Sequence, residues 1–409
     1  MTNTSSIDFD TVLLTPEYLA NPYHYYAQMQ DQEPVYWSTR LNAWVLTRYT
    51  DVHSALKNPL LISGQRVASY ANVLPEKTQV EMRPLFYQFD KWIGNMDAPD
   101  HTRLRRLVNV AFTARMVQNL QTDIEQLVHE LLDAMDTHGQ VDFVREFAYP
   151  LPAIVIAKML GVPTEFRQRF MKWSDDLTAY SGTGTPKPEV AKASSRSAAE
   201  LTSLFRDLAN ERRSNPQDDL LSRLVEAEEE GDRLNEQELL GMCGFLIVAG
   251  HETTMALLAN GMLALLRHPD SQQQLRNDPQ LITTAVEEFL RFDSPIQHQT
   301  RTAAKDLEIA GITIKKGDRV IPVLGAANRD ADTFPNPDLF DLTRDPNPHL
   351  AFGFGPHYCI GAPLARLEAQ IAIPAILKRW SKIELLDPQP VFRHHTSQRN
   401  PIQLQLRLV

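Results

Sequence analysis

The sequence predicts a mainly α-helical fold with a small β part. Apolar residues recur at helical spacing along most of the 409 residues, which is the pattern of amphipathic helices that cover a core. Alternating or β-branched stretches are confined to three short places, residues 35–47, 307–324 and 402–408. The apolar share of 43% is enough for a large core. Together these observations favour a mainly α domain with a few short strands.

The N-terminal part of the chain alternates helices with one hairpin. Residues 16–34, "PEYLANPYHYYAQMQDQEP", form a first amphipathic segment. The stretch "VYWSTRLNAWVLT" that follows predicts a hairpin, because β-branched and aromatic residues flank a polar turn. Helical periodicity then predicts further helices over residues 50–59, about 102–116 and 117–135.

Two stretches lack this periodicity. Residues 62–100 hold Phe86, Tyr87, Phe89 and Trp92 among polar residues. Long loops in compact domains are usually functional or disordered, and the aromatic side chains favour an ordered loop that faces a ligand. Residues 181–190, "SGTGTPKPEV", predict a second, flexible connection between helices.

Charge and cysteine content exclude several classes of protein. A net charge of −10 and a pI of about 5.7 argue against nucleic acid or an anionic membrane surface as the main partner. Two cysteines, Cys243 and Cys359, cannot build a disulfide framework and fit a reducing compartment. The first residues, "MTNTSSIDFD", have neither the basic nor the apolar part of a signal peptide. We therefore expect a cytoplasmic protein.

The most apolar segment of the chain is interrupted by polar residues. Two uncharged runs, residues 239–250 and 255–266, flank the sequence His-Glu-Thr-Thr at 251–254. A carboxylate at mid-bilayer is costly, so a long buried helix is favoured over a membrane span. Two interpretations of the interruption stay open. Either the threonine hydroxyls bond back to the preceding turn, or the helix opens locally and aims a hydroxyl and a carboxylate into a cavity.

The glycine-rich stretch "FGFGPHYCIG", residues 352–361, contains Cys359. It lacks the phosphate-loop pattern, offers too few ligands for zinc and has no CxxCH for covalently attached haem. A nucleophilic cysteine and an axial ligand of haem iron both remain. The residues that follow predict a helix, and free N–H groups at a helix N-terminus stabilise a thiolate, which favours the ligand role. Gly355 and Gly361 would leave room for a flat macrocycle against the backbone.

This stretch matches the FxxGxxxCxG signature of cytochrome P-450, so the chain resembles the haem-thiolate monooxygenases, and in particular their soluble bacterial members. Further motifs agree in order: "HTRLR", "AGHETT", "EEFLR", "TRTAAKDLEIAG" and "FPNPDLFDLTRD". The resemblance covers about residue 15 to the C-terminus. It implies a single cytochrome P-450 domain over residues 1–409, with residues 1–14 as a flexible tail. It also implies non-covalent haem b between the central helix and the cysteine loop.

The resemblance assigns roles to individual residues. Cys359 would be the axial thiolate, and Glu252 and Thr253 would carry protons to bound dioxygen. The residues expected around the haem are His101, Arg105, Arg301 and His357 at the propionates, and Phe352 and Gly361 near the sulfur. The residues expected in the substrate pocket are Ile93, Phe245, Val248, Ala249, Ile296, Gln297 and Ser397. The residues expected in a structural ion-pair network are Glu288, Arg291 and Arg344.

The implied activity is insertion of one oxygen atom from dioxygen into a hydrophobic small molecule, such as a terpenoid, steroid, fatty acyl or aromatic compound. A separate ferredoxin or flavodoxin would supply the electrons. Two alternatives are a haem-thiolate enzyme with peroxide-driven or oxidative-coupling chemistry, and a haem-binding scaffold without turnover; the intact Glu-Thr pair favours the monooxygenase. Basic residues expected to form a face for an acidic ferredoxin are Arg103, Arg106, Arg366, Lys378 and Arg379.

Overall fold

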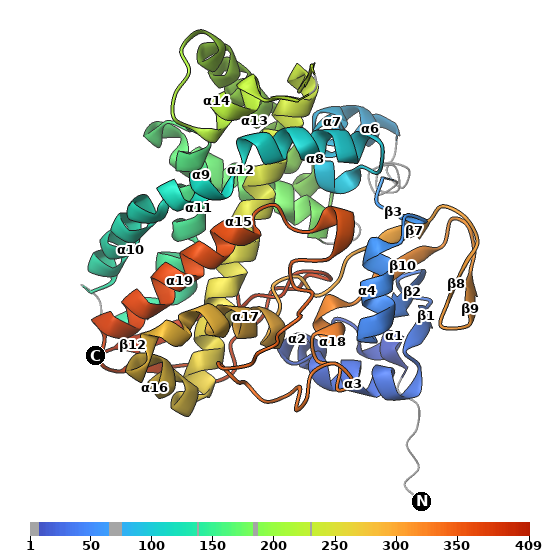
Figure 1. Ribbon diagram of the computed structural model, residues 1–409, viewed down its shortest axis with the longest axis vertical. Helices are drawn as coiled ribbons and strands as arrows, with labels where there is room; N and C mark the ends of the chain where they lie inside the picture. Colours follow the sequence, from blue (N-terminus) through green and yellow to red (C-terminus); the bar gives the residue numbers. More distant parts are fainter. Residues whose placement is uncertain (1–7, 65–75, 137–138, 183–186, 230) are drawn as a thin grey trace, which may run out of the picture.

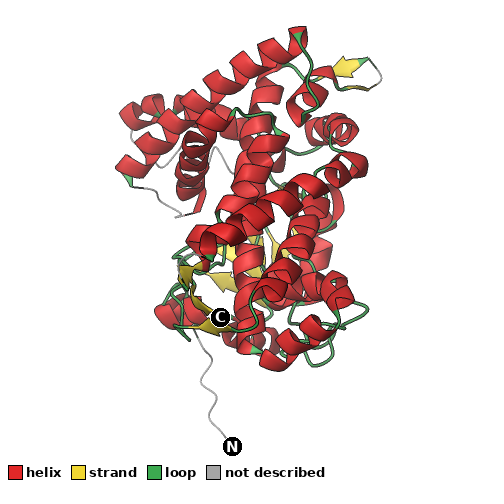
Figure 2. Ribbon diagram, turned by 90° about the vertical axis from the view of Figure 1, so that its left-hand side faces the viewer, coloured by secondary structure: helices red, strands yellow, loops and turns green. Residues whose placement is uncertain are grey.

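The computed structural model describes residues 8–64, 76–136, 139–182, 187–229 and 231–409. Helices fill most of the molecule, and most strands gather toward one end (Figures 1 and 2). The predicted mainly α fold with a small β part is therefore confirmed.

The helices of the first half are α1 (Phe9–Val12), α2 (Pro16–Ala20), α3 (Tyr23–Gln32), α4 (Tyr49–Lys57), α6 (Glu76–Glu81), α7 (Arg83–Asp90), α8 (Asp100–Ala111), α9 (Ala114–Asn119), α10 (Gln121–Met135), α11 (Pro150–Met159) and α12 (Arg167–Gly182). Those of the second half are α13 (Pro188–Ser214), α14 (Leu220–Glu226), α15 (Glu236–Arg267), α16 (Pro269–Asn277), α17 (Ile282–Phe292), α18 (Leu324–Ala327) and α19 (Ala362–Arg379). Short turns of other helix types are η1 (Ile93–Asn95), η2 (Val144–Ala148), η3 (Thr164–Phe166), η4 (Pro279–Leu281) and η5 (Gly355–His357).

The strands are β1 (Val35–Ser38), β2 (Ala43–Leu46), β3 (Leu61–Ile62), β4 (Gln140–Asp142), β5 (Glu228–Glu229), β6 (Asp232–Arg233), β7 (Arg301–Ala303), β8 (Leu307–Ile309), β9 (Ile312–Ile314), β10 (Arg319–Pro322), β11 (Ile383–Leu385) and β12 (Gln405–Leu408). The larger sheet has the order β1-β2-β10-β7-β3, and a second has the order β11-β12-β4. Each of the three predicted β stretches contains strands. In the first, β1 and β2 form the predicted antiparallel hairpin, with Trp37 opposite Trp44 and their rings 5.1 Å apart.

The central helix α15 crosses the middle of the molecule (yellow in Figure 1). It begins with a capping box, in which the Asn235 side chain accepts from the Glu238 N–H and the Glu238 carboxylate accepts from the Asn235 N–H. Its length and composition would suit a membrane span, but 78% of its most apolar window is buried inside the protein. A helix that is apolar on all sides is buried, so α15 is the predicted core helix.

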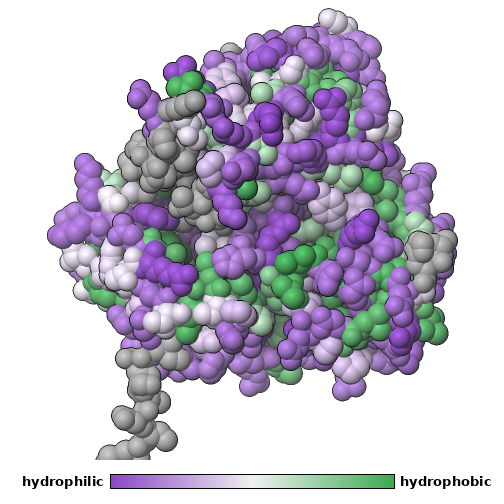
Figure 3. Space-filling view, turned by 180° about the vertical axis from the view of Figure 1, so that it is seen from behind, coloured by the Kyte–Doolittle hydropathy of each residue, from purple (hydrophilic) through white to green (hydrophobic). Residues whose placement is uncertain are grey.

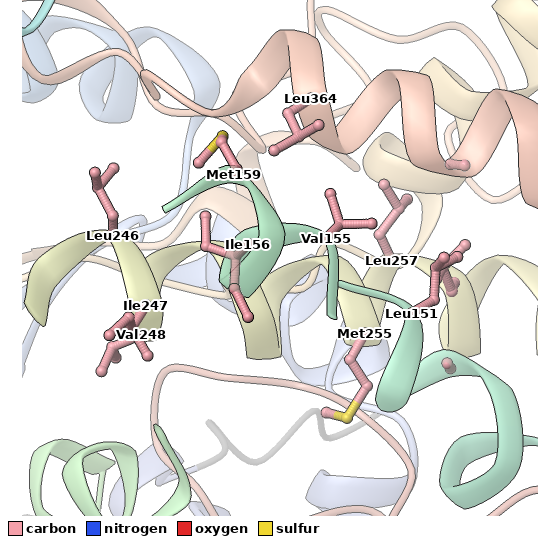
Figure 4. Packing of buried hydrophobic residues seen from close by; sticks show 14 of the residues in the cluster. Leu151, Val155, Ile156, Met159, Leu246, Ile247, Val248, Met255, Leu257 and Leu364 are labelled. Carbon is pink, nitrogen blue, oxygen red and sulfur yellow. The ribbon is translucent and has the colours of Figure 1, made fainter. Parts of the chain in front are cut away.

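Neighbouring helices surround α15. Figure 4 shows Leu151, Val155 and Ile156 of α11 beside the stretch of α15 that carries Leu246 and Met255. On another side, α17 packs closely against α15 at Gly261. A Cβ atom at this position would lie only 2.8 Å from the Phe289 ring. Seen from behind, the surface is mostly hydrophilic, with hydrophobic side chains in small groups (Figure 3). The large apolar clusters are made of buried side chains.

The structure differs from the sequence predictions in three places. In the expected tail, residues 8–14 pack against the protein: Asp8 caps α1, and Phe9 and Leu13 are buried. Residues 1–7 lie outside the described residues. The stretch 62–100 is largely helical where it is described, with α6, α7 and η1, and Phe89 and Trp92 are buried whereas Tyr87 is exposed. The second expected connection, residues 181–190, is shorter than predicted, because α12 continues to Gly182 and α13 begins at Pro188. Residues 183–186 lie outside the described residues.

Candidate active site

A cavity of about 380 Å³ lies between α15 and the loop that leads into α19. Figure 1 shows the two helices crossing near this loop. The cavity has an apolar part, which includes Phe245 and Val248 of α15, and a basic edge, which includes His101 and Arg301. Cys359 also lines it. One space thus brings together residues that stand more than 250 positions apart in the sequence.

Cys359 sits where the sequence places it, just before the N-terminus of α19. Its N–H donates to the Phe352 carbonyl at 3.0 Å, which closes the glycine-rich loop. Burial raises the pKa of the Cys359 thiol, whereas hydrogen bonds from the backbone N–H groups of Gly361 and Ala362 and the charge of Arg105 oppose that rise. The N–H groups at the helix terminus thus offset part of the cost of burying a thiolate, which is the direction that the sequence predicted.

The two glycines of the loop differ in their surroundings. A Cβ atom at position 361 would meet only the Cys359 sulfur, at 3.9 Å, so this position leaves space beside the thiol. Gly355 has a φ of +72°, and a Cβ there would lie 3.2 Å from the Leu56 carbonyl and from Lys57. Gly355 does not line the cavity, and a role beside a macrocycle stays a prediction. It is needed for a left-handed turn that packs on the end of α4.

Four basic side chains line the cavity at one edge. His101 and Arg105 lie one turn apart on α8, and the His101 ring is 4.0 Å from the ring of His357. Arg301 of β7 is buried and donates to the Gln299 amide oxygen at 2.6 Å and to the Thr300 carbonyl at 3.0 Å. Burial and the neighbouring Arg105 lower the pKa of His101. This cluster is suited to bind an anionic group.

The polar interruption of α15 agrees with the first interpretation left open by the sequence, a threonine hydroxyl bonded to the preceding turn, and the predicted local opening is wrong. The Thr253 hydroxyl donates to the Ala249 carbonyl at 2.6 Å, and the helix continues through this point without an opening. Thr253 nevertheless lines the cavity, and so does Thr254. The side chain of Glu252 is 1% exposed and lies outside the cavity lining.

Glu252 pairs with a residue that the sequence did not single out. Arg393, in the C-terminal segment, donates to both Glu252 carboxylate oxygens at 2.9 Å, and its own side chain is 36% exposed. Burial raises the pKa of Glu252, and the charge and hydrogen bonds of Arg393 oppose this. The carboxylate is therefore joined to the surface through a single arginine.

The His251 side chain is held by two partners from other parts of the chain. Its Nδ1 lies 2.9 Å from the Ser174 hydroxyl and its Nε2 lies 3.1 Å from the Tyr149 carbonyl. Because a carbonyl can only accept, Nε2 carries the proton. Burial lowers the pKa of His251 to about 4.

Comparison with known proteins identifies the family. Residues 73–406 match the family model described as "Cytochrome P450". The chain is 40% identical over 379 residues to "Polyketide biosynthesis cytochrome P450 PksS" of Bacillus subtilis, covering 90% of this chain and 91% of that one. It is 41% identical over 369 residues to "Vitamin D(3) 25-hydroxylase" of Pseudonocardia autotrophica, covering 88% and 87%.

A solved structure agrees along nearly the whole chain. P450BioI, crystallised in complex with an acyl carrier protein ligated to hexadec-9Z-enoic acid, aligns with a TM-score of 0.89 at 37% identity, over 96% of this chain and 99% of that one. The chain belongs to the cytochrome P450 family. It is therefore an oxidoreductase, a monooxygenase that acts on hydrophobic small molecules, and the family implies a haem-thiolate centre.

The apolar part of the P450 cavity contains six of the seven residues predicted for it. They are Ile93, Phe245, Val248, Ala249, Ile296 and Ser397. Gln297 is the exception and its prediction is wrong. It is buried, its amide bonds to the Tyr26 hydroxyl at 3.2 Å and to the Ser294 carbonyl at 2.8 Å, and it does not line the cavity. Of the four aromatic residues noted in the 62–100 stretch, only Phe89 and Trp92 line the cavity.

The ion-pair network lies behind the cysteine loop of the P450. Glu288 and Arg291 are fully buried and share two hydrogen bonds, at 2.7 and 2.8 Å. Arg344 approaches Glu288 at 3.4 Å as an ion pair, although its Nε makes no hydrogen bond in the described part of the chain. The structure therefore brings the three predicted residues together.

The expected basic face is weaker than the sequence suggested. Arg366 is paired with Glu287 at 2.7 Å, and Arg379 is paired with Asp133 and Asp136. A third residue, Arg103, is paired with Asp232 at 3.1 Å and with Glu238. Because these charges are compensated locally, three of the five expected cations contribute little net positive potential.

Proposed function

We propose that this P450 binds haem b in the cavity, with Cys359 as the thiolate ligand of the iron. The chemistry of the lining supports this fit. The sole thiol of the cavity wall lies at a helix N-terminus, and the Gly361 position leaves space beside it. Apolar side chains make up much of the rest of the wall, which suits a largely apolar macrocycle.

We assign the basic edge of the cavity to the haem propionates. His101, Arg105, Arg301 and His357 all line the cavity. Two arginines and two histidines can donate charge-assisted hydrogen bonds to two carboxylates. Phe352 also lines the cavity, and its ring lies 4.5 Å from the Arg366 guanidinium, which fixes it beside the cysteine loop.

When bound, haem would supply the centre at which dioxygen is activated with two electrons. Thr253 and Glu252 would transfer the protons that this reaction consumes. The Thr253 hydroxyl gives its own hydrogen to the Ala249 carbonyl, so its lone pairs are left to accept a hydrogen bond from a group in the cavity. Glu252 stands next to it on α15, and its carboxylate connects to the surface through the partly exposed Arg393. Because a guanidinium keeps its protons, Arg393 would hold the carboxylate in place, and Glu252 itself would take up protons and pass them toward Thr253.

We propose a hydrophobic substrate that carries few charges. The similarity to a vitamin D(3) hydroxylase and to a P450 crystallised with a fatty acyl chain supports lipid-like compounds. Apolar residues such as Phe245 and Val248 would bind it by removing its surface from water. A separate ferredoxin or flavodoxin in the cytoplasm would provide the electrons, and a reducing compartment would keep the thiol of Cys359 free.

The observation that carries this proposal is the position of Cys359 in the cavity wall. The absorption spectrum of the haem-loaded protein tests the proposal. The reduced carbon monoxide complex of the parent should show the strongly red-shifted Soret band of a thiolate ligand. Cys359→His should retain some haem and lose that band. The matched control is Cys243→Ala, because Cys243 is fully buried in α15 and does not line the cavity. A Cys359→His variant that keeps the band would refute the assignment, and absence of turnover with any hydrophobic compound would favour the scaffold.

A further inference from the structure

The C-terminal segment places two polar side chains, His395 and Gln398, in the wall of the pocket, whose other polar lining residues include Thr253, His298 and Gln299. The segment is fixed by main-chain hydrogen bonds to the stretch after α17. The Gln297 N–H donates to the Ser397 carbonyl at 2.7 Å, and the Arg399 N–H donates to the Pro295 carbonyl at 2.8 Å. The two side chains are therefore held in place by the fold and do not depend on a free loop.

The hydrogen bonds of His395 determine where its proton lies. Its Nδ1 accepts from the backbone N–H groups of Ser397 at 3.1 Å and Gln398 at 2.9 Å. A nitrogen that accepts carries no hydrogen in the neutral ring, so the hydrogen is on Nε2. Burial, followed by the charges of Arg393 and His298, lowers the pKa of His395 to about 3. The ring is thus neutral and offers one N–H.

Each of the two side chains has a buried polar atom without a hydrogen-bond partner in the described part of the chain. His395 is 92% buried, at 8% exposure, and its Nε2 has no hydrogen-bond partner among the residues that the structure describes. The same holds for the buried Oε1 of Gln398. A buried polar group without a partner costs about 1–3 kcal/mol. If water satisfies these atoms before binding, a ligand that expels it must replace its hydrogen bonds.

We propose that the substrate is a hydrophobic molecule with a hydroxyl group, which accepts a hydrogen bond from His395 Nε2 and donates one to Gln398 Oε1. This inference rests on the proposed function of the cavity. A hydroxyl group is the smallest function that satisfies one donor and one acceptor together. A carboxylate would meet the Gln398 oxygen with like partial charge, and a hydrocarbon would leave both atoms unpaired.

The test compares two ligands of the same shape, cyclododecanol and cyclododecane, by calorimetry on the haem-loaded protein. The quantity measured is the ratio of the dissociation constant of the alcohol to that of the hydrocarbon. Differences in hydration of the free ligands cancel when this ratio is compared between variants. His395→Asn is the informative variant, because an asparagine oxygen can still accept from the two backbone N–H groups while the Nε2 donor is lost.

We expect His395→Asn to raise the ratio roughly three- to tenfold, the effect of one lost hydrogen bond. Gln398→Leu should raise it as well. The matched control is His394→Asn, since His394 is the exposed neighbour and carries the same substitution. Haem content, read from the Soret absorbance, should stay unchanged in all three variants.

Two results would overturn the inference. One is a ratio in His395→Asn that equals the ratio of the parent. The other is an equal loss of affinity for both ligands together with loss of haem, which would mean that His395 supports the haem or the turn. Failure of the proposed function has a different signature, because the parent would then lack the thiolate band of the carbon monoxide complex.

Discussion

Replacement of Glu288 by glutamine should be among the most destabilising single changes in this P450. Glu288 and Arg291 have side chains that are 0% exposed, and the two share two short hydrogen bonds. Arg291 also donates to three backbone carbonyls, those of Asn328, Pro337 and Leu339. Glu288→Gln leaves this guanidinium buried beside a neutral amide. Breaking a buried ion pair from one side costs about 3–5 kcal/mol.

The loss should reach the cysteine loop. The Glu288 carboxylate accepts from the Asp341 N–H at 2.9 Å and from the Asn347 amide at 3.2 Å. Both residues lie in the irregular segment that leads into the glycine-rich loop. We therefore expect faster amide hydrogen exchange over residues 339–350 and faster loss of haem, in addition to a lower denaturation midpoint.

Two further variants calibrate the magnitude. Arg344→Gln removes the more distant partner at 3.4 Å and leaves the Glu288–Arg291 pair, so its cost should be smaller. Glu384→Gln is the matched control, because Glu384 pairs with Arg407 on the exposed edge of β11 and the midpoint should not move. Urea unfolding of the four haem-loaded proteins gives the comparison. A Glu288→Gln midpoint as close to the parent as that of Glu384→Gln would refute the reasoning.

Two further predictions concern the proton route. Thr253→Ala removes the hydroxyl that bonds Ala249 and lines the cavity, so it should still bind substrate but release most of its electrons as hydrogen peroxide; product formed per NADH consumed measures this, and unchanged coupling would rule out the role. Arg393→Gln removes the charge that opposes the raised pKa of Glu252. The pKa of Glu252 should therefore rise further. As the pH falls, Glu252 should become protonated at a higher pH than in the parent. The acid limb of the product-formation profile should then move to higher pH, whereas Arg407→Gln should leave it in place.

The elements with strong local patterns could be predicted from the sequence. Polar caps and two apolar runs define α15, alternation defines the β1–β2 hairpin, and the glycine-rich loop with the helix after it defines the position of Cys359. The helices α6 and α7 were missed because both are short, α6 is almost wholly polar, and the aromatic residues of α7 stand among polar ones. The buried start of the chain at Phe9 was missed because a short segment gains its order from distant partners, such as the Tyr36 ring 6.0 Å away.

Residues of the site were predictable where a motif fixes their spacing. Cys359 and the pair at 252–253 belong to such motifs. Arg393 and His395 do not, because they lie in an irregular segment without periodicity, and Arg393 meets α15 through a contact that spans 141 positions. Gln297 shows the converse error. Its neighbours Ile296 and His298 line the cavity, but extended backbone alternates its side chains, so Gln297 points to the buried tyrosines.

The C-terminal segment also links two parts of the reaction. Arg393 reaches Glu252 on the proton route, and His395, two residues on, lines the substrate pocket. The segment is anchored by Arg399, which is buried and donates to the Asp293 carboxylate at 2.6 Å and to the Ala20 carbonyl at 3.0 Å. Because the two residues stand two positions apart on one anchored segment, we expect a ligand that displaces the backbone at His395 to shift the guanidinium that holds the Glu252 carboxylate as well. Substrate fit and proton supply are thus expected to change together when this segment is altered, even by substitutions that contact neither the substrate nor α15.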